Sequence, residues 1–153
     1  MRSGGIFRAA ILALLAPLTS GLTCGEGPQA SAETPPLPAS IEDIMAYSRS
    51  LLEKQGFPVE SFLPEKGFLS TGWKTQLSPR YQEGLRERVQ IYLWEKEGAT
   101  VAAVDAQREI NDNYRSPLRE ADADWIRSGN NRALQDRLVL LLKMEFDPQW
   151  KKN

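Results

Sequence analysis

The feature that most constrains the fold is a regular alternation of side-chain types between Leu85 and Trp94. One side of the extended chain carries apolar residues, with Glu87 as the exception, and the other carries polar and aromatic residues. Because successive side chains of a strand point to opposite faces, this pattern predicts a strand buried on one side only. The apolar set is Leu85, Val89, Ile91 and Leu93, and the outward set is Arg86, Arg88, Gln90, Tyr92 and Trp94.

A second alternating segment, Thr100 to Ile110, follows a Glu97-Gly98 turn, and Ala102, Val104 and Ala106 are expected on its buried side. A connection this short predicts an antiparallel hairpin.

Two shorter strands are predicted before this hairpin. The first, Phe57 to Leu63, is interrupted by Pro58, and a turn over residues 64–67 follows it. The second runs from Phe68 to Thr75 and places Leu69, Thr71 and Trp73 on one side. The segment around Ser78-Pro79-Arg80 is expected to be a loop.

Two helices are predicted at the ends of this region. The first begins at Ser40, which can cap it together with Asp43, and ends before Gly56. The second begins near Asn130 or Asn131. Their apolar residues are Ile41, Ile44, Met45, Leu51 and Leu52 in the first, and Leu134, Leu138, Leu141 and Leu142 in the second. Between hairpin and second helix, residues 111–129 are polar, with Trp125 and Ile126 expected to hold part of them to the core.

These elements predict an α+β fold of the helix-grip type. An antiparallel β-sheet of three to four strands is expected to carry an N-terminal and a C-terminal helix on one face. The predicted organisation is a signal peptide over residues 1–24, a disordered tether over 25–39, one domain over 40–147, and a C-terminal tail over 148–153.

The N-terminal segment is typical of export. Basic residues up to Arg8 precede an apolar run from Ala9 to Ala16, which is shorter than the roughly 20 apolar residues of a membrane-spanning helix. The only cysteine, Cys24, follows this run and is the expected lipidation site, for acyl chains such as palmitate.

Two other fates of this segment stay open. The residues before the cysteine, Gly21-Leu22-Thr23, match a lipoprotein signal imperfectly, and cleavage after Ala30-Ser31-Ala32 would release a soluble periplasmic or secreted protein. The third alternative is an uncleaved anchor. The location favoured here is the outer membrane, with a lipid-anchored domain facing the periplasm.

The composition argues against enzyme chemistry. The chain has no histidine, which excludes Ser-His and Cys-His nucleophiles and histidine-bound zinc, and no phosphate-binding glycine motif is present. We expect no catalytic residue, cofactor, metal or nucleic-acid partner. Glu120, Asp122 and Asp124 are candidates for a cation site, but without further oxygen ligands at loop spacing solvated charges are the favoured interpretation.

The outward residues Arg86, Arg88, Gln90, Tyr92 and Trp94 form a candidate partner-binding face, because aromatic and arginine side chains are enriched at interface hot spots. The ordinary alternative is a solvent-facing sheet surface. Trp73 and Trp125 are expected to be packing residues.

The arrangement resembles a helix-grip domain of the BamC family, the lipoprotein C subunit of the outer-membrane β-barrel assembly machinery. The residues that carry the resemblance are the Ile41-Glu42-Asp43-Ile44 helix, Gly56-Phe57-Pro58-Val59, Gly67-Phe68-Leu69-Ser70-Thr71-Gly72-Trp73, Arg86-Glu87-Arg88-Val89-Gln90-Ile91, Trp125 and the leucine-rich last helix. Members of that family usually carry two such domains and a long unstructured N-terminal segment, whereas one domain and a short tether are expected here.

The resemblance implies a non-catalytic scaffold or accessory role in outer-membrane protein assembly, with other envelope assembly proteins as partners. The alternative is a periplasmic carrier that holds a small apolar ligand between helix and sheet.

Overall fold

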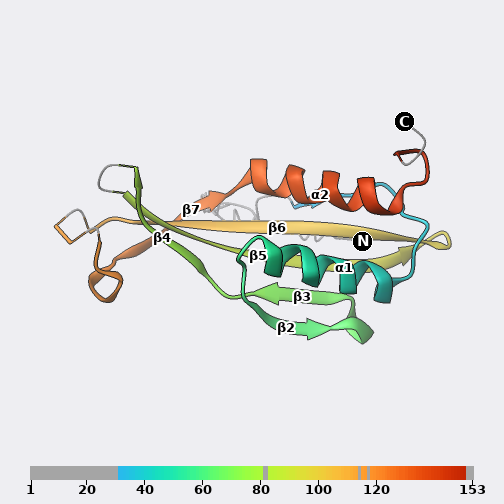
Figure 1. The fold of residues 1–153 in the computed structure, drawn as a ribbon, viewed down its shortest axis with the longest axis horizontal. Helices are drawn as coiled ribbons and strands as arrows, with labels where there is room; N and C mark the ends of the chain where they lie inside the picture. Colours follow the sequence, from blue (N-terminus) through green and yellow to red (C-terminus); the bar gives the residue numbers. More distant parts are fainter. Residues whose placement is uncertain (1–30, 81–82, 114, 117, 151–153) are drawn as a thin grey trace, which may run out of the picture.

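The hairpin predicted from the alternating pattern is the centre of a single antiparallel sheet with two helices on one face (Figure 1). The computed structural model describes residues 31–80, 83–113, 115–116 and 118–150. The strands are β1 (Ala32–Glu33), β2 (Val59–Leu63), β3 (Phe68–Thr71), β4 (Lys74–Arg80), β5 (Glu83–Lys96), β6 (Ala99–Asn111) and β7 (Trp125–Asn130). The helices are α1 (Ile41–Lys54) and α2 (Arg132–Phe146), and the single 3-10 turns are η1 (Pro64–Lys66) and η2 (Glu120–Asp122). The α+β class is confirmed.

The hairpin of β5 and β6 is the longest pairing in the described part of the chain. Twelve consecutive residues of β5, from Leu85 to Lys96, pair with β6 without a register shift. The turn residues Glu97 and Gly98 have φ angles of 54° and 79°. Two positive φ angles in succession are typical of the tight turns whose twist matches that of the flanking strands.

The sheet contains seven described strands, so the expected number of three to four was wrong. The path through the sheet is β1-β6-β5-β3-β2, while β4 and β7 pair with the far ends of β5 and β6. In Figure 1 these four strands extend beyond the helices at the left. We call β4, β7 and the parts of β5 and β6 paired with them the arm.

The hydrophobic core lies between the helices and the sheet. Side chains from β3, β5, β6, both helices and the segment before α1 are fully or almost fully buried there. The largest are Leu37, Ile44, Met45, Leu52, Leu69, Ile91, Leu138 and Leu142. Burial of these side chains on one face of the hairpin explains the alternation of the sequence, since the hydrophobic effect holds each strand to one register.

Glu87, a charged residue among the inward-facing residues of β5, is satisfied by polar partners. Its Oε1 accepts hydrogen bonds from Arg108 Nε at 2.8 Å and Asn131 Nδ2 at 2.6 Å. Asn131 is also the N-cap of α2, since its side chain accepts from the amide of Leu134. A carboxylate at this position therefore joins the hairpin to the start of the second helix.

Both helices begin close to the expected residues, and α1 ends before Gly56 as expected. The hydroxyl of Ser40 accepts from the amide of Asp43 at 3.1 Å, and Gly56, with φ of 80°, follows the C-cap of α1. Gly67 has φ of 58°, and an added Cβ there would lie 2.2 Å from the carbonyl oxygen of Leu93. Only glycine fits this close approach of the η1 turn to β5.

The expected strand from Phe68 to Thr75 is two strands, and Trp73 lies on the opposite side from the predicted one. If the register of β3 on β5 continued, Gly72 would lie opposite Arg88. The register of β4 on β5 instead places Trp73 opposite Arg88. This shift of one residue reverses which face each side chain occupies. Lys74–Arg80 is strand β4, whereas the sequence predicted a loop around Ser78-Pro79-Arg80.

The expected tether is ordered where the structure describes it. Ala32 and Glu33 pair with β6, and the amide of Ala102 donates to the hydroxyl of Thr34 at 3.0 Å. Leu37 has no exposed surface and exchanges backbone hydrogen bonds with Thr100. These contacts place residues 32–39 in the domain. The sequence did not predict this, because local composition does not show which segment pairs with a free strand edge.

The polar segment after β6 contains a strand that the sequence did not predict. Its last residues form β7, in which Ile126 is 45% exposed and does not reach the core. The side chain of Asn111 closes the base of this segment by accepting from the amides of Asn113 and Asp124. Pairing with β6, rather than burial of Ile126, thus holds the segment in place.

The predicted signal peptide and Cys24 lie outside the described residues. Among the residues that the structure does describe, no helix is long and apolar enough to cross a membrane.

The order of the 32–39 segment can be tested with Leu37→Ala. Removing this fully buried side chain is expected to lower the free energy of unfolding by about 2–4 kcal/mol, measured by urea denaturation. The control Leu118→Ala removes a side chain that is 66% exposed and should change it by less than about 0.5 kcal/mol. Equal effects would show that Leu37 does not belong to the core.

Candidate partner-binding face

The five outward residues of β5 lie on the sheet face opposite the core side chains. Their partners on β6 are Glu109, Gln107, Asp105, Ala103 and Val101, which point to the same side. We call this surface the outer face. The structure divides it into an arginine half within the arm and an aromatic half near the Glu97-Gly98 turn.

In the arginine half, Arg86 is held from several sides. Its guanidinium lies 4.5 Å from the ring centroid of Trp73 and 4.8 Å from that of Trp125. Its Nε and Nη2 atoms donate to Glu109 Oε2 at 2.7 and 2.6 Å. A planar guanidinium suits this environment, because it can stack on rings while donating in its own plane. Arg86 is therefore a structural element of the arm.

The neighbouring Arg88 is used in a similar way. Its guanidinium lies 4.8 Å from the ring centroid of Trp73, and its Nε donates to Gln107 Oε1 at 2.8 Å. Both arginines thus have partners within the chain. They were proposed as donors to a binding partner, and these contacts leave them less free for that role.

The aromatic half is more accessible. Tyr92 is 43% exposed and Trp94 is 38% exposed, and both follow the same side of β5. The ring of Tyr92 packs on Phe68 of β3 with a centroid distance of 5.1 Å. The opposite residues, Ala103 and Val101, are small and buried. Two exposed aromatic rings on a long, fully paired hairpin form a rigid apolar surface.

Gln90 lies between the two halves and accepts from the hydroxyl of Tyr92 at 3.3 Å. The sequence interpretation missed Phe68, Glu109 and Trp125 as members of this face. Glu109 could have been predicted from the sequence, because a hairpin with its turn at Glu97-Gly98 places Arg86 opposite Glu109. The stacking of Trp125 had no such signal, because it depends on the path of residues 112–124.

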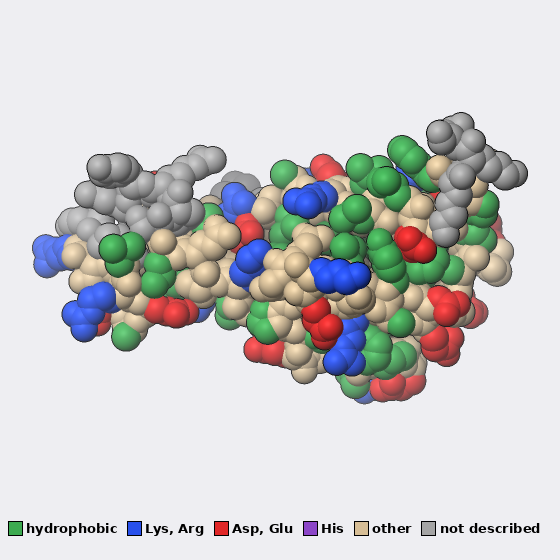
Figure 2. Space-filling model, viewed as in Figure 1, with side chains coloured by type: hydrophobic (Ala, Val, Ile, Leu, Met, Phe, Trp, Pro, Cys, Tyr) green, Lys and Arg blue, Asp and Glu red, His purple; other side chains and the backbone are tan. Residues whose placement is uncertain are grey.

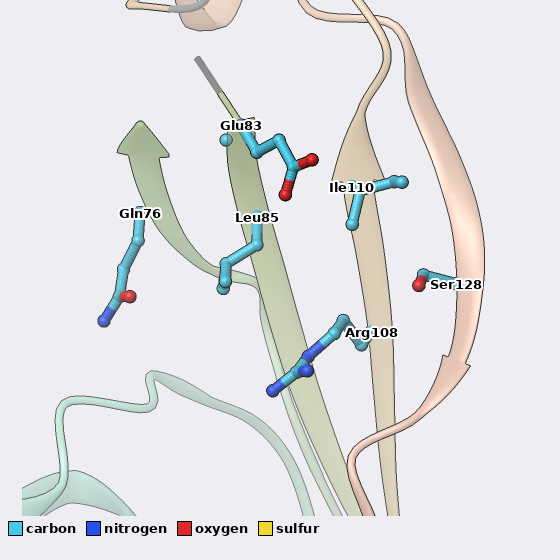
Figure 3. A pocket seen from close by; sticks show the side chains of 7 residues that line it. Gln76, Glu83, Leu85, Arg108, Ile110 and Ser128 are labelled. Carbon is cyan, nitrogen blue, oxygen red and sulfur yellow. The ribbon is translucent and has the colours of Figure 1, made fainter. Parts of the chain in front are cut away.

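A groove of about 450 Å³ lies on the other side of the arm (Figure 3). It is lined by Gln76, Glu83, Gly84, Leu85, Arg108, Ile110 and Ser128. Arg108 is paired with Glu87, so the cation at its wall is already neutralised. The groove lies on the arm, outside the layer between helices and sheet where the carrier hypothesis places an apolar ligand.

The three carboxylates considered for a cation do not form a metal site. Glu120 accepts from the hydroxyl of Thr75 at 3.0 Å, and Asp122 pairs with Arg119 at 3.1 Å. No group of three or more acidic, histidine or cysteine side chains within the described residues is arranged to hold a metal.

No protein-family model matches this chain, and no curated protein matches it significantly.

The role of Arg86 in the arm can be tested with Arg86→Lys. Lysine keeps the charge but cannot stack its head group between two rings, so the free energy of unfolding should fall by about 1–2 kcal/mol. The control Arg119→Lys, in an ion pair whose arginine side chain is 74% exposed, should change it by less than about 0.5 kcal/mol. Urea denaturation measures both, and an unaffected Arg86→Lys variant would contradict the stacking argument.

Proposed function

We propose that this chain is an exported, lipid-anchored protein of the bacterial envelope. In this proposal it acts as a non-catalytic scaffold that binds another envelope protein through the aromatic half of its outer face. The observation that carries the binding role is the pair of exposed rings, Tyr92 and Trp94, on the most extensively paired hairpin of the described chain. Aromatic side chains on a rigid support bind with little loss of conformational entropy.

We also propose a helix-grip fold for this domain. It is supported by two helices on one face of an antiparallel sheet, with the opposite face free of helices among the described residues. A role in outer-membrane protein assembly is what the BamC resemblance implies. We infer that the domain presents its outer face to another component of such machinery in the periplasm.

The lipid anchor is proposed at Cys24 on the pattern of the N-terminal sequence. The structure supports cleavage before this residue over cleavage after Ala32, because Ala32 pairs with Val104 in β1. A chain beginning at Glu33 would lose the first residue of this strand.

Intact mass of the mature protein purified from membranes tests the anchor. The wild-type chain is expected to begin at an acylated Cys24, and Cys24→Ala should abolish the acyl mass and membrane retention. An unacylated wild-type chain beginning at Glu33 would overturn the anchor.

The binding role is tested by affinity purification from solubilised envelopes. The double variant Tyr92→Ser/Trp94→Ser is expected to recover at least about tenfold less of the envelope-assembly proteins than the wild type, because loss of aromatic hot-spot residues usually costs that much affinity. The control Ile126→Ser changes an apolar residue of similar exposure outside the outer face and should not reduce recovery.

Urea denaturation of the double variant checks that the domain remains folded. Recovery of the wild-type protein alone, or equal recovery with all variants, would overturn the binding role.

A further inference from the structure

Helix α2 exposes apolar side chains on the surface that faces away from the sheet. Leu138 and Leu142 are fully buried, whereas Leu140 is 43% exposed and Met144 is 46% exposed. Residues four apart lie on the same helix face, so Leu140 and Met144 are neighbours. In Figure 2, hydrophobic side chains lie along the upper border of the molecule, where Figure 1 places α2.

Trp150 extends this surface beyond the end of the helix. It is 45% exposed, and the ammonium group of Lys143 lies 6.0 Å from its ring centroid. Tryptophan is enriched where proteins meet the interface between lipid and water, because its ring is apolar and its N–H is polar.

The charge of this end of the chain differs from that of the rest. Residues 132–153 contain five basic and three acidic residues, a net charge of +2. Residues 25–131 contain twelve basic and seventeen acidic residues, a net charge of −5. The basic residues on α2 are Arg132, Arg137 and Lys143. A positive segment on an acidic domain favours contact with an anionic surface.

The position of the anchor points to the same surface. Only seven residues lie between Cys24 and Ala32, and the eight residue steps from one to the other span at most about 28 Å when fully extended. Ala32 begins β1, and β1 packs against α2 as well as pairing with β6. A lipid on Cys24 would therefore hold the α2 side of the domain close to the bilayer.

We propose that the exposed surface of α2, formed by Leu140, Met144 and Trp150 with the basic residues Arg132, Arg137 and Lys143, docks on the membrane that holds the lipid anchor. This inference rests on the anchor at Cys24 given in the proposed function. The three apolar side chains enter the headgroup region, while the arginine and lysine side chains reach lipid phosphates. The occupant of this surface is an anionic lipid bilayer.

The anchor makes such a small surface effective. Three exposed apolar side chains bind a membrane weakly by themselves, but a short tether converts docking into an intramolecular step at a high effective concentration. Docking through α2 also directs the outer face, on the opposite side of the sheet, toward the periplasm. Tyr92 and Trp94 would then be presented to a soluble or membrane-embedded partner.

The test uses the full acylated protein in vesicles of phosphatidylethanolamine and phosphatidylglycerol. Because the chain has one cysteine and its sulfur carries the lipid, a cysteine introduced at Leu140 or Tyr92 is the only reactive thiol. An environment-sensitive fluorophore is attached to Leu140→Cys, and Tyr92→Cys is the control at an equally exposed residue of the outer face.

Quenching by brominated lipids is expected to be at least about three times stronger at Leu140 than at Tyr92. Arg132→Glu combined with Arg137→Glu should reduce the quenching at Leu140 by at least about half, because it removes the attraction to phosphatidylglycerol. Equal quenching at the two positions would overturn docking through α2. Shielding of the Leu140 label in detergent that increases with protein concentration would also overturn it, in favour of contact with a second copy.

The two proposals fail in different ways. Intact mass of each labelled protein shows whether Cys24 is acylated before the vesicles are made. An unacylated mature chain overturns the anchor itself, whereas an acylated protein whose Leu140 label remains in water overturns docking alone.

Discussion

The continuous pairing of β5 with β6 is the constraint on which the other elements depend. The Glu97-Gly98 turn sets the register, and twelve successive residue pairs extend it along the hairpin. A slip of one residue would expose every core side chain of the moving strand, so burial under α1 and α2 holds the register. Strands β3 and β4 then pair with β5, and β1 and β7 pair with β6.

The hairpin is longer than the two helices that cover it. Its covered part and the uncovered arm are therefore stabilised by different contacts. The helix-covered part is held by side chains such as Ile91 and Leu138, which have almost no exposed surface. The arm is held on its outer face by Arg86 between Trp73 and Trp125, with Glu109 as the ion-pair partner. Exposed apolar side chains include Tyr92 and Trp94 on the outer face and Leu140 and Met144 on α2. In the proposals above, the first pair contacts a partner protein and the second contacts the membrane.

The sequence predicted helices and strands well where the evidence, such as a helix cap, lies within a single element. The cap at Ser40 was predicted, and the second cap was placed near Asn130 or Asn131, because capping chemistry depends on residues three positions apart. The predictions failed where a distant partner decides the outcome. Trp73 lies on the face opposite to the predicted one because the register of β4 on β5 is shifted by one residue relative to that of β3. Residues 32 and 33 pair with the sheet because the edge of β6 is available to them.

The sequence by itself determined the α+β class, the central hairpin, the two helices and the alignment of Arg86, Arg88, Gln90, Tyr92 and Trp94 on one face. Periodicity and turn chemistry suffice for these features because they depend on neighbours along the chain. Only the tertiary structure decided that both arginines are used within the domain while Tyr92 and Trp94 stay accessible. Stacking partners such as Trp125 come from a distant segment, and exposure depends on how every strand and helix packs together.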